Sequence, residues 1–289
     1  MTSKVAIDLD FLRSWIGREQ TLEDVVTLDL ARKFHATLEL PGPPPERGQP
    51  AAPLIHFCLA QPAVPTAELA EDGHPAKGGF LPPVPLPRRM WAGGDVTFHG
   101  PIVIGEAVRR VSRVVDLRSK SGRSGHLVFV TVEHRLESGS RLLVQERQDI
   151  VYRDAVTGET APQPVADPAG VGQEHQDVAI SPPLLFRYSA LTFNSHRIHY
   201  DRDYAVGVEG YRDLVVHGPL QATLLCNLAA RIKGKPATHF SFRAQSPVFA
   251  DDILTLNASA DGAEWRLWTC RPDGPVAMSA TARWADDAE

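Results

Sequence analysis

A helical apolar face followed directly by strand patterns is the feature that most constrains how this chain can fold. Between residues 216 and 232 apolar side chains recur four apart, and Gly234 follows the last of them, which predicts a helix with one apolar face. The residues that set this spacing are Leu220, Leu224, Leu228 and Ile232. Runs of alternating apolar and polar residues come next, at 238–248, 253–259, 264–270 and 276–284. A period of two is typical of half-buried strands, so the second half predicts an antiparallel meander wrapped around one helix.

The first half of the chain repeats this order of helical segments followed by long strands. Helices are expected at 7–16 and 28–38, and strands at 96–98, 107–117, 126–136 and 141–152. Two Pro-dense stretches, 41–53 and 78–89, suit long loops, because proline lacks the N–H that helices and central strands use. The polar stretch 154–179 suits a linker. We therefore expect a first repeat at 1–153, a linker at 154–179 and a second repeat at 180–289, related by duplication.

The composition restricts the partners of the protein. Acidic residues number 35 against 30 basic ones, a net charge of −5, whereas nucleic-acid binders usually carry a basic face. The uncharged stretch 214–230 is too short and too polar for a membrane span, which needs about 20 apolar residues. Cys58, Cys226 and Cys270 are too few and too scattered for a disulfide framework or a cysteine metal site. Since the N-terminus does not read as a secretory signal, we expect a cytoplasmic protein that binds neither nucleic acid nor membrane.

Side chains with acid–base chemistry are densest just before the predicted helix. They are Asn194, His196, Arg197, His199, Asp201 and Asp203, followed by His217, Gly218 and Pro219 at the helix start. This cluster suits an active site, although a helix-capping network or a solvated loop would have the same composition. A metal site could be sketched from His196, His199 and Asp201, but no further ligand has the required spacing. We therefore expect no bound metal.

The same segment resembles the signature of the MaoC-like hydratases and dehydratases of acyl thioesters. That signature reads Asp-x-Asn-Pro-(Ile/Val)-His and is followed later by His-Gly, whereas this chain reads Asn-Ser-His-Arg-Ile-His at 194–199 and His-Gly at 217–218. The family's Asp is therefore Asn194 here, its Asn is His196, and its Pro is Arg197. The string FNSHRIHYD is similar to a subgroup that contains 3-hydroxyacyl thioester dehydratases and bacterial mesaconyl-CoA and itaconyl-CoA hydratases. First-half strings such as HFCLAQPAVP and QERQDIVYRD resemble the bacterial members, so the likeness covers nearly the whole chain.

The resemblance implies an α+β fold of the double hot-dog type, in which two repeats of an antiparallel sheet each wrap around a central helix. It also implies reversible hydration of an enoyl thioester with His199 as the acid–base group, because an imidazole titrates near neutral pH. The N–H of Gly218, at a helix start, would stabilise the thioester oxygen as it becomes negative.

Asn194 is the main departure from the family pattern, because an amide cannot act as a base. Three outcomes stay open. His199 works alone while Asn194 positions the water, a nearby carboxylate (Asp201 or Asp203) substitutes, or the protein binds thioesters without turnover. We favour the first, because the related subgroup has the same Asn by resemblance and is associated with hydration.

Substrate contacts are expected from several residues of both halves. They are His196, Arg197, His217, Arg89 and Trp91, with Arg88 and Arg243 as weaker candidates. Arginine binds carboxylates and phosphates through two hydrogen bonds, so these side chains suit a substrate carboxylate or the phosphates of coenzyme A. A tryptophan suits the wall of an acyl pocket, although it is also a common core residue.

The bacterial strings favour a short branched dicarboxylyl-CoA, such as mesaconyl-CoA or itaconyl-CoA, hydrated to citramalyl-CoA. The alternatives are a 3-hydroxyacyl thioester dehydratase of fatty-acyl metabolism, a non-catalytic protein that binds acyl thioesters, and a thioesterase. Coenzyme A would be part of the substrate, so we expect no separate cofactor. The fold also allows a homodimer of double hot-dog chains.

Overall fold

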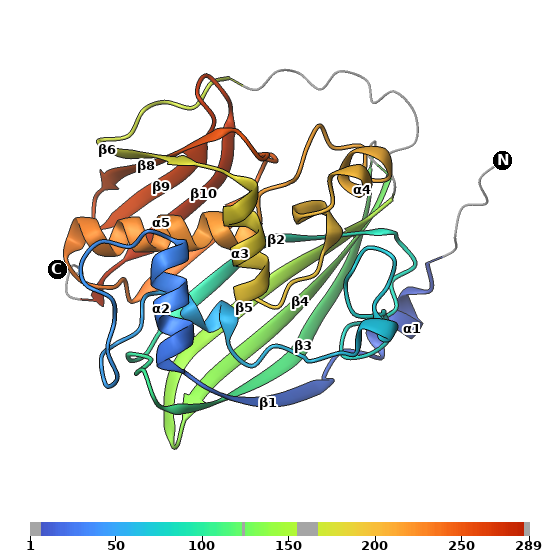
Figure 1. Ribbon diagram of the computed structural model, residues 1–289. Coiled ribbons are helices and arrows are strands. Elements are labelled where there is room, and N and C mark those ends of the chain that lie inside the picture. The colour runs from blue at the N-terminus through green and yellow to red at the C-terminus, as the bar shows by residue number, and fades with distance from the viewer. Residues whose placement is uncertain (1–6, 123–124, 155–166, 286–289) are drawn as a thin grey trace.

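The computed structural model describes residues 7–122, 125–154 and 167–285 and places ten strands in one antiparallel sheet (Figure 1). The strands are β1 (Glu19–Val25), β2 (Arg88–Phe98), β3 (Ala107–Gly122), β4 (Gly125–Ser138), β5 (Arg141–Arg153), β6 (Glu174–Ala179), β7 (His239–Ala244), β8 (Ile253–Asp261), β9 (Glu264–Cys270) and β10 (Val276–Arg283). The α-helices are α1 (Leu9–Arg13), α2 (Leu28–Thr37), α3 (Pro182–Leu191), α4 (Arg202–Gly207) and α5 (Gly218–Lys233). Three 3₁₀ helices are η1 (Ile55–Cys58), η2 (Thr66–Glu68) and η3 (Arg197–His199).

The two halves of the sheet have the same strand order. The first half runs β1-β3-β4-β5-β2 and the second runs β6-β8-β9-β10-β7, so each follows the order first, third, fourth, fifth, second. The halves join where β2 pairs with β7, from Gly93 opposite Arg243 to Thr97 opposite His239. This repeated order is what a duplication would leave. The expected meander of the last four strands is wrong in one respect, because β7 pairs with β10 and β2 rather than with β8.

Helix α5 forms as the leucine spacing predicts and lies against the second half of the sheet (Figure 1). Pro219 stands in its first turn, and Gly234 ends it in the left-handed conformation. Helix α2 also matches its prediction, and the hydroxyl of Thr27 accepts from the Leu30 N–H to cap it. In the described part of the first half no helix corresponds to α5. The buried η1 packs against β2 there instead, so among the described residues a long central helix is found in the second half alone.

Strands β3, β4 and β5 extend the three longest predicted runs of the first half, and β2 begins at Arg88, within the stretch assigned to a Pro-rich loop. Strands β1 and β6 were not predicted, because both are edge strands with exposed faces and few apolar residues. The last residues of the expected linker form β6, and residues 155–166 lie outside the described residues. The expected helix at 7–16 shortens to α1.

The main core is shared by the two halves and contains α5, α3, α2 and η1 with the strands beneath them. A second, smaller core fills the other end of β3, β4 and β5, under α1 and residues 80–86. Among the described residues, no helix combines the length and apolar character required to cross a membrane. The segments that carry the acid–base side chains lie between α3 and α5, beside the loop of the first half that precedes β2.

Candidate active site

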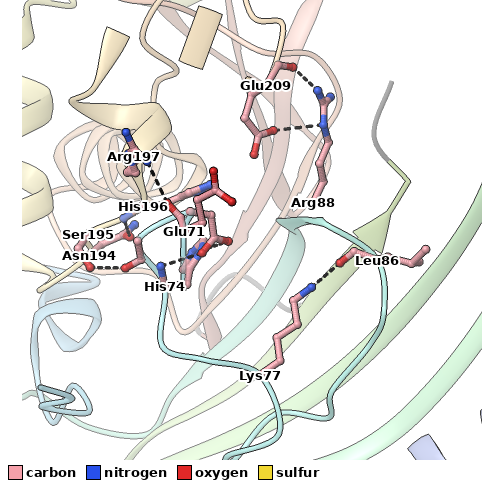
Figure 2. A network of polar contacts seen from close by, with 12 residues as sticks. Glu71, His74, Lys77, Leu86, Arg88, Asn194, Ser195, His196, Arg197 and Glu209 are labelled. Carbon is pink, nitrogen blue, oxygen red and sulfur yellow. Dashed lines mark hydrogen bonds and ion pairs between the residues drawn. The ribbon is translucent and has the colours of Figure 1, made fainter. Parts of the chain in front are cut away.

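Residues 194–199 leave the end of α3 in a tight turn that directs two histidines inward. The Oδ1 atom of Asn194 accepts a hydrogen bond of 3.0 Å from the His196 N–H (Figure 2), the local bond that asparagine makes in turns. Ile198 anchors η3 in the core, and the His196 and His199 side chains are buried. The oxygen of Asn194 is therefore engaged in holding the loop.

His199 is held in one tautomer by the backbone. Its Nδ1 lies 2.7 Å from the carbonyl oxygen of Val215, and a carbonyl only accepts, so Nδ1 carries the hydrogen and Nε2 the lone pair. Burial lowers the pKa of His199 to about 4. The imidazole is therefore neutral at pH 7 and presents a base at Nε2.

His217 and the start of α5 support His199 from one side. The two rings stack with centroids 3.6 Å apart and planes inclined by 19°, while Nε2 of His217 lies 2.8 Å from the Ser189 hydroxyl. His217 is fully buried, and burial followed by the charges of His199 and His196 lowers its pKa. Gly218 begins α5, where the first N–H groups have no acceptor within the helix. The stacked pair of neutral imidazoles thus lies at the residue that precedes the first turn of α5.

A segment of the first half, Glu71–His74, is docked against this turn by backbone contacts (Figure 2). The Arg197 N–H donates to the Asp72 carbonyl at 2.9 Å, and the Ser195 hydroxyl donates to the Gly73 carbonyl. Gly73 has φ +88°, and a Cβ there would lie 1.9 Å from the Ser195 carbonyl oxygen. Only glycine allows so close an approach of the two chains.

This docking places an Asp–His pair beside the predicted histidines. Nδ1 of His74 lies 2.9 Å from Oδ2 of Asp72, and the His74 N–H donates to Oδ1 at 3.0 Å. The His74 ring lies 4.1 Å from that of His196, which lies 5.4 Å from that of His199. Asp72 and His74 were not predicted from the sequence, because they precede the turn by about 120 residues. Locally the sequence offers only the residue type of His74, which lies between the two Pro-dense stretches.

Electrostatics keep this group of histidines neutral. Burial and the Arg89 charge lower the pKa of His74 to about 4, against the pull of Asp72. Burial and the charges of His74 and His199 lower the pKa of His196, whose Nε2 is buried with no hydrogen-bond partner among the residues that the structure describes. Burial would raise the pKa of Asp72, but hydrogen bonds from His74 and the charge of Arg89 lower it. Asp72 is therefore the ionised member of the cluster.

Asp72, His74 and His196 also offer candidate metal-ligand atoms, which lie within 4.8 Å of one another. However, Nδ1 of His74 already lies 2.9 Å from Oδ2 of Asp72, so these two atoms are engaged with each other. Asp201, the carboxylate of the sketched sequence site, bonds to Arg197 and to the Tyr204 N–H instead.

Two of the arginines predicted from the sequence already form ion pairs with carboxylates in the structure. Arg197 pairs with Asp201 at 2.7 Å, and its guanidinium carbon lies 4.2 Å from the centre of the Tyr204 ring. Arg88 forms a buried pair with Glu209 at 3.2 Å. Arg243 is exposed on β7.

Arg89 lies opposite Tyr152 in the sheet, and its charge acts on Asp72, His74 and His196. Among the described residues Arg89 forms no ion pair within 4.0 Å, although its charge acts on the ionised Asp72 and on Tyr152. Lys77, nearby, donates to the Val84 carbonyl at 3.2 Å and to the Leu86 carbonyl. Arg89 is thus the predicted arginine whose charge acts on the histidines.

Trp91 packs in the wall where the two halves meet. Its ring contacts Phe57 of η1 and Phe242 of β7, with centroid distances of 5.0 and 5.5 Å. Its indole N–H is buried and has no acceptor in the part of the chain that is described. The three rings therefore form an apolar wall where the two halves of the sheet meet.

Known proteins resemble this chain in sequence over most of its length. Residues 54–250 match the sequence model of a family described as hydroxyacyl-thioester dehydratase type 2. The chain is 46% identical over 268 residues to the mesaconyl-C(4)-CoA hydratase of Chloroflexus aurantiacus, covering 93% of this chain and 96% of that protein.

Solved structures share the fold at low identity. A MaoC-like dehydratase from Phytophthora capsici superposes with a TM-score of 0.69 at 16% identity, over 96% of this chain and 98% of that one. A protein of Mycobacterium tuberculosis described as a double hotdog superposes with a TM-score of 0.58 at 16% identity, over 92% and 95% of the two chains. The expected α+β double hot-dog fold is therefore confirmed.

Proposed function

Because the chain belongs to the hydroxyacyl-thioester dehydratase type 2 family, and is accordingly a hydro-lyase, we propose that it reversibly hydrates a dicarboxylyl enoyl-CoA thioester. The observation that supports this proposal is the cluster of neutral imidazoles within electrostatic reach of Arg89, which forms no ion pair within 4.0 Å among the described residues. The relative that is 46% identical is named for mesaconyl-C(4)-CoA, which makes that thioester our first choice of substrate.

The reaction assigns a task to each group at the start of α5. Nε2 of His199 takes a proton from water while the oxygen bonds to the β-carbon and the double-bond electrons move toward the thioester. The Gly218 N–H and the positive end of α5 stabilise the thioester oxygen as it becomes negative. The imidazolium of His199 then returns the proton to the α-carbon. Dehydration follows the same steps in reverse, and no bound cofactor is needed in either direction.

The remaining predicted residues hold these groups or the substrate. His217 keeps the His199 ring in place by stacking, and the Asn194 oxygen shapes the turn by binding the His196 N–H. His196 faces the substrate between the other imidazoles. Arg197 serves the turn through its pair with Asp201.

Arg89 is the residue that favours a dicarboxylyl substrate. In mesaconyl-C(4)-CoA the free carboxylate is attached to the carbon that receives the hydroxyl, so it must lie beside the acid–base group. Burying that carboxylate requires a cationic partner, and Arg89 lies within electrostatic reach of His74 and His196. Hydrogen bonds from a guanidinium to a carboxylate are among the stronger ones in proteins.

A 3-hydroxyacyl thioester dehydratase of longer chains is the second candidate. The family description supports it, as does the apolar wall of Trp91, Phe57 and Phe242. A long chain needs such a wall and no cation beside the β-carbon. The two candidates therefore differ in what they require of Arg89.

The deciding experiment follows loss of enoyl absorbance and product mass with mesaconyl-CoA, itaconyl-CoA and crotonyl-CoA. We expect addition of one water to a dicarboxylyl substrate, and for Arg89→Gln a rise of at least about tenfold in its KM, the effect of losing one charged hydrogen bond. Arg118→Gln, an exposed change on β3, is the matched control. Preferred turnover of crotonyl-CoA, unaffected by Arg89→Gln, would favour the second candidate. Binding without turnover, or release of free coenzyme A, would overturn both.

A further inference from the structure

The first repeat contributes an Asp–His pair to a site that is otherwise built by the second repeat. We propose that Asp72 and His74 form the second group that contacts the reacting water, in the place that Asn194 leaves without a base. This inference rests on the proposed hydration and names a further catalytic residue, His74, with Asp72 as its positioning residue. It is carried by the geometry of the pair and by the way its segment is docked.

The Asp72 carboxylate fixes the tautomer of His74. An ionised carboxylate only accepts hydrogen bonds, so the Nδ1–Oδ2 contact of 2.9 Å places the hydrogen on Nδ1 and leaves the lone pair on Nε2. The second carboxylate oxygen accepts from the His74 backbone N–H, which fixes the carboxylate in turn. A base held by an orienting partner is the usual arrangement of an acid–base pair. His199 has the same tautomer, with the Val215 carbonyl as its partner.

Three hydrogen bonds hold the segment that carries the pair against the catalytic turn. Backbone contacts of Asp72, Gly73 and Glu71 with Ser195 and Arg197 fix its position. The His74 ring then lies 4.1 Å from that of His196, which in turn lies 5.4 Å from that of His199. His74 retains some exposure, unlike the fully buried His217, and so can meet a bound water.

Asn194 cannot perform this task itself. Its oxygen already accepts the His196 N–H, and its amide nitrogen has no lone pair for a proton. With two imidazoles facing the site, the water donates one O–H to Nε2 of His199 and the other to Nε2 of His74. The proton that moves goes to His199 and then to the α-carbon, while the oxygen bonds to the β-carbon. The hydrogen bond to His74 orients the oxygen and remains on the new hydroxyl group.

The test compares kcat and KM of His74→Gln and Asp72→Asn with wild type on mesaconyl-CoA. We expect kcat to fall about 10- to 100-fold, the effect of one hydrogen bond in a charged transition state, with KM changed less than about threefold. His199→Ala serves as the reference for loss of the proton-accepting group. His175→Gln, an exposed change on β6, is the control that keeps wild-type rates. Circular dichroism and Tm establish that each variant is folded.

Asp72→Asn also tests the tautomer. The new amide can donate to Nδ1 of His74, which moves the hydrogen to Nε2 and removes the acceptor from the water. Asp72→Glu keeps a carboxylate at this position, so its kcat should be higher than that of Asp72→Asn. A hydrogen bond with a purely structural role would not predict this difference.

The results that would refute the role of Asp72 and His74 differ from those that would refute the proposed function. Wild-type turnover with full kcat in folded His74→Gln would remove His74 from the reaction. Loss of activity on chelation, restored by Zn²⁺, would convert the pair into metal ligands and equally overturn it. A wild-type protein that hydrates none of the three thioesters would refute the proposed function instead.

Discussion

At the residue scale, the site depends on histidines that burial keeps neutral. An exposed imidazole is partly protonated near pH 6.5, whereas the pKa values of His199 and His74 are lowered to about 4. Each has its Nδ1 hydrogen committed to an oxygen, so each offers its Nε2 lone pair at neutral pH. On the proposed assignment, His74, oriented by the Asp72 carboxylate, takes the place of the carboxylate that the family signature has at position 194.

Replacing Asn194 by Asp restores the residue of the family signature and tests that interpretation. A carboxylate oxygen can still accept the His196 N–H, so the turn should persist. We expect kcat to change by less than about tenfold, because the second contact to the water is already supplied by His74; steady-state kinetics measure it. Asn194→Ala removes the acceptor and should cost about 1 kcal/mol of stability. A rise in kcat of a hundredfold or more for Asn194→Asp would show that the wild-type site lacks a second acid–base group, which would contradict the role of His74.

At the scale of elements, two loops rather than two helices assemble the site. The turn before η3 donates hydrogen bonds to backbone carbonyls of the Glu71–His74 segment, from the Ser195 hydroxyl, the Arg197 guanidinium and the Arg197 backbone N–H (Figure 2). Gly73 permits this contact because it has no Cβ. The relative positions of the imidazoles therefore depend on Gly73, because a larger residue would not fit there.

Gly73→Ala should separate the two loops without altering any acid–base group. The added Cβ would overlap the Ser195 carbonyl oxygen, and φ +88° is unfavourable for alanine. We expect kcat to fall at least about tenfold, as for His74→Gln, with a small change in Tm. Gly42→Ala is the matched control, because Gly42 also has a positive φ but no atom within 4 Å of its Cβ position. Equal kcat in both variants would contradict the importance of the docking.

Local periodicity explains which elements could be predicted. Helix α5 and the long strands β3–β5 bury one face each, so their apolar residues recur at 3.6 or 2 positions. The edge strands β1 and β6 bury little and leave no such pattern. The cluster at 194–217 was visible because its side chains are close in sequence. The contribution of Asp72 and His74 was not visible in the sequence. Their segment is held in place through its backbone carbonyls, which every residue has, so no residue type marks the contact.

At the scale of the whole molecule, the candidate site is divided between the two halves of the sheet, which have the same strand order. The second repeat keeps the central helix and so supplies Gly218 and His217. The described part of the first repeat has no such helix, and its long loop crosses to the other half with Asp72 and His74. The buried Arg88–Glu209 pair also joins the two repeats, next to the β2–β7 junction. Neither repeat holds the complete set of groups, so we expect activity to require both.

The buried histidines also make the stability of the whole chain depend on pH. Burial lowers the pKa of His74, His134 and His199 to about 4 in the folded protein, against about 6.5 when unfolded. Between these values the unfolded chain binds protons that the folded chain does not. The free energy of unfolding therefore has its full contribution from these groups above pH 6.5 and loses it as the pH falls toward 4.

Thermal unfolding at pH 7.5 and at pH 5.0 should accordingly differ, with Tm lower by at least about 5 °C at the acidic pH. His134→Leu, outside the catalytic turn, removes one of the three groups and should make the decrease shallower. His175→Gln removes an exposed histidine and should leave the decrease unchanged. A Tm that stays constant between the two pH values would mean that the folded chain can protonate these histidines. Their neutrality at the site, on which the assignment of His199 and His74 as lone-pair acceptors depends, would then be lost as well.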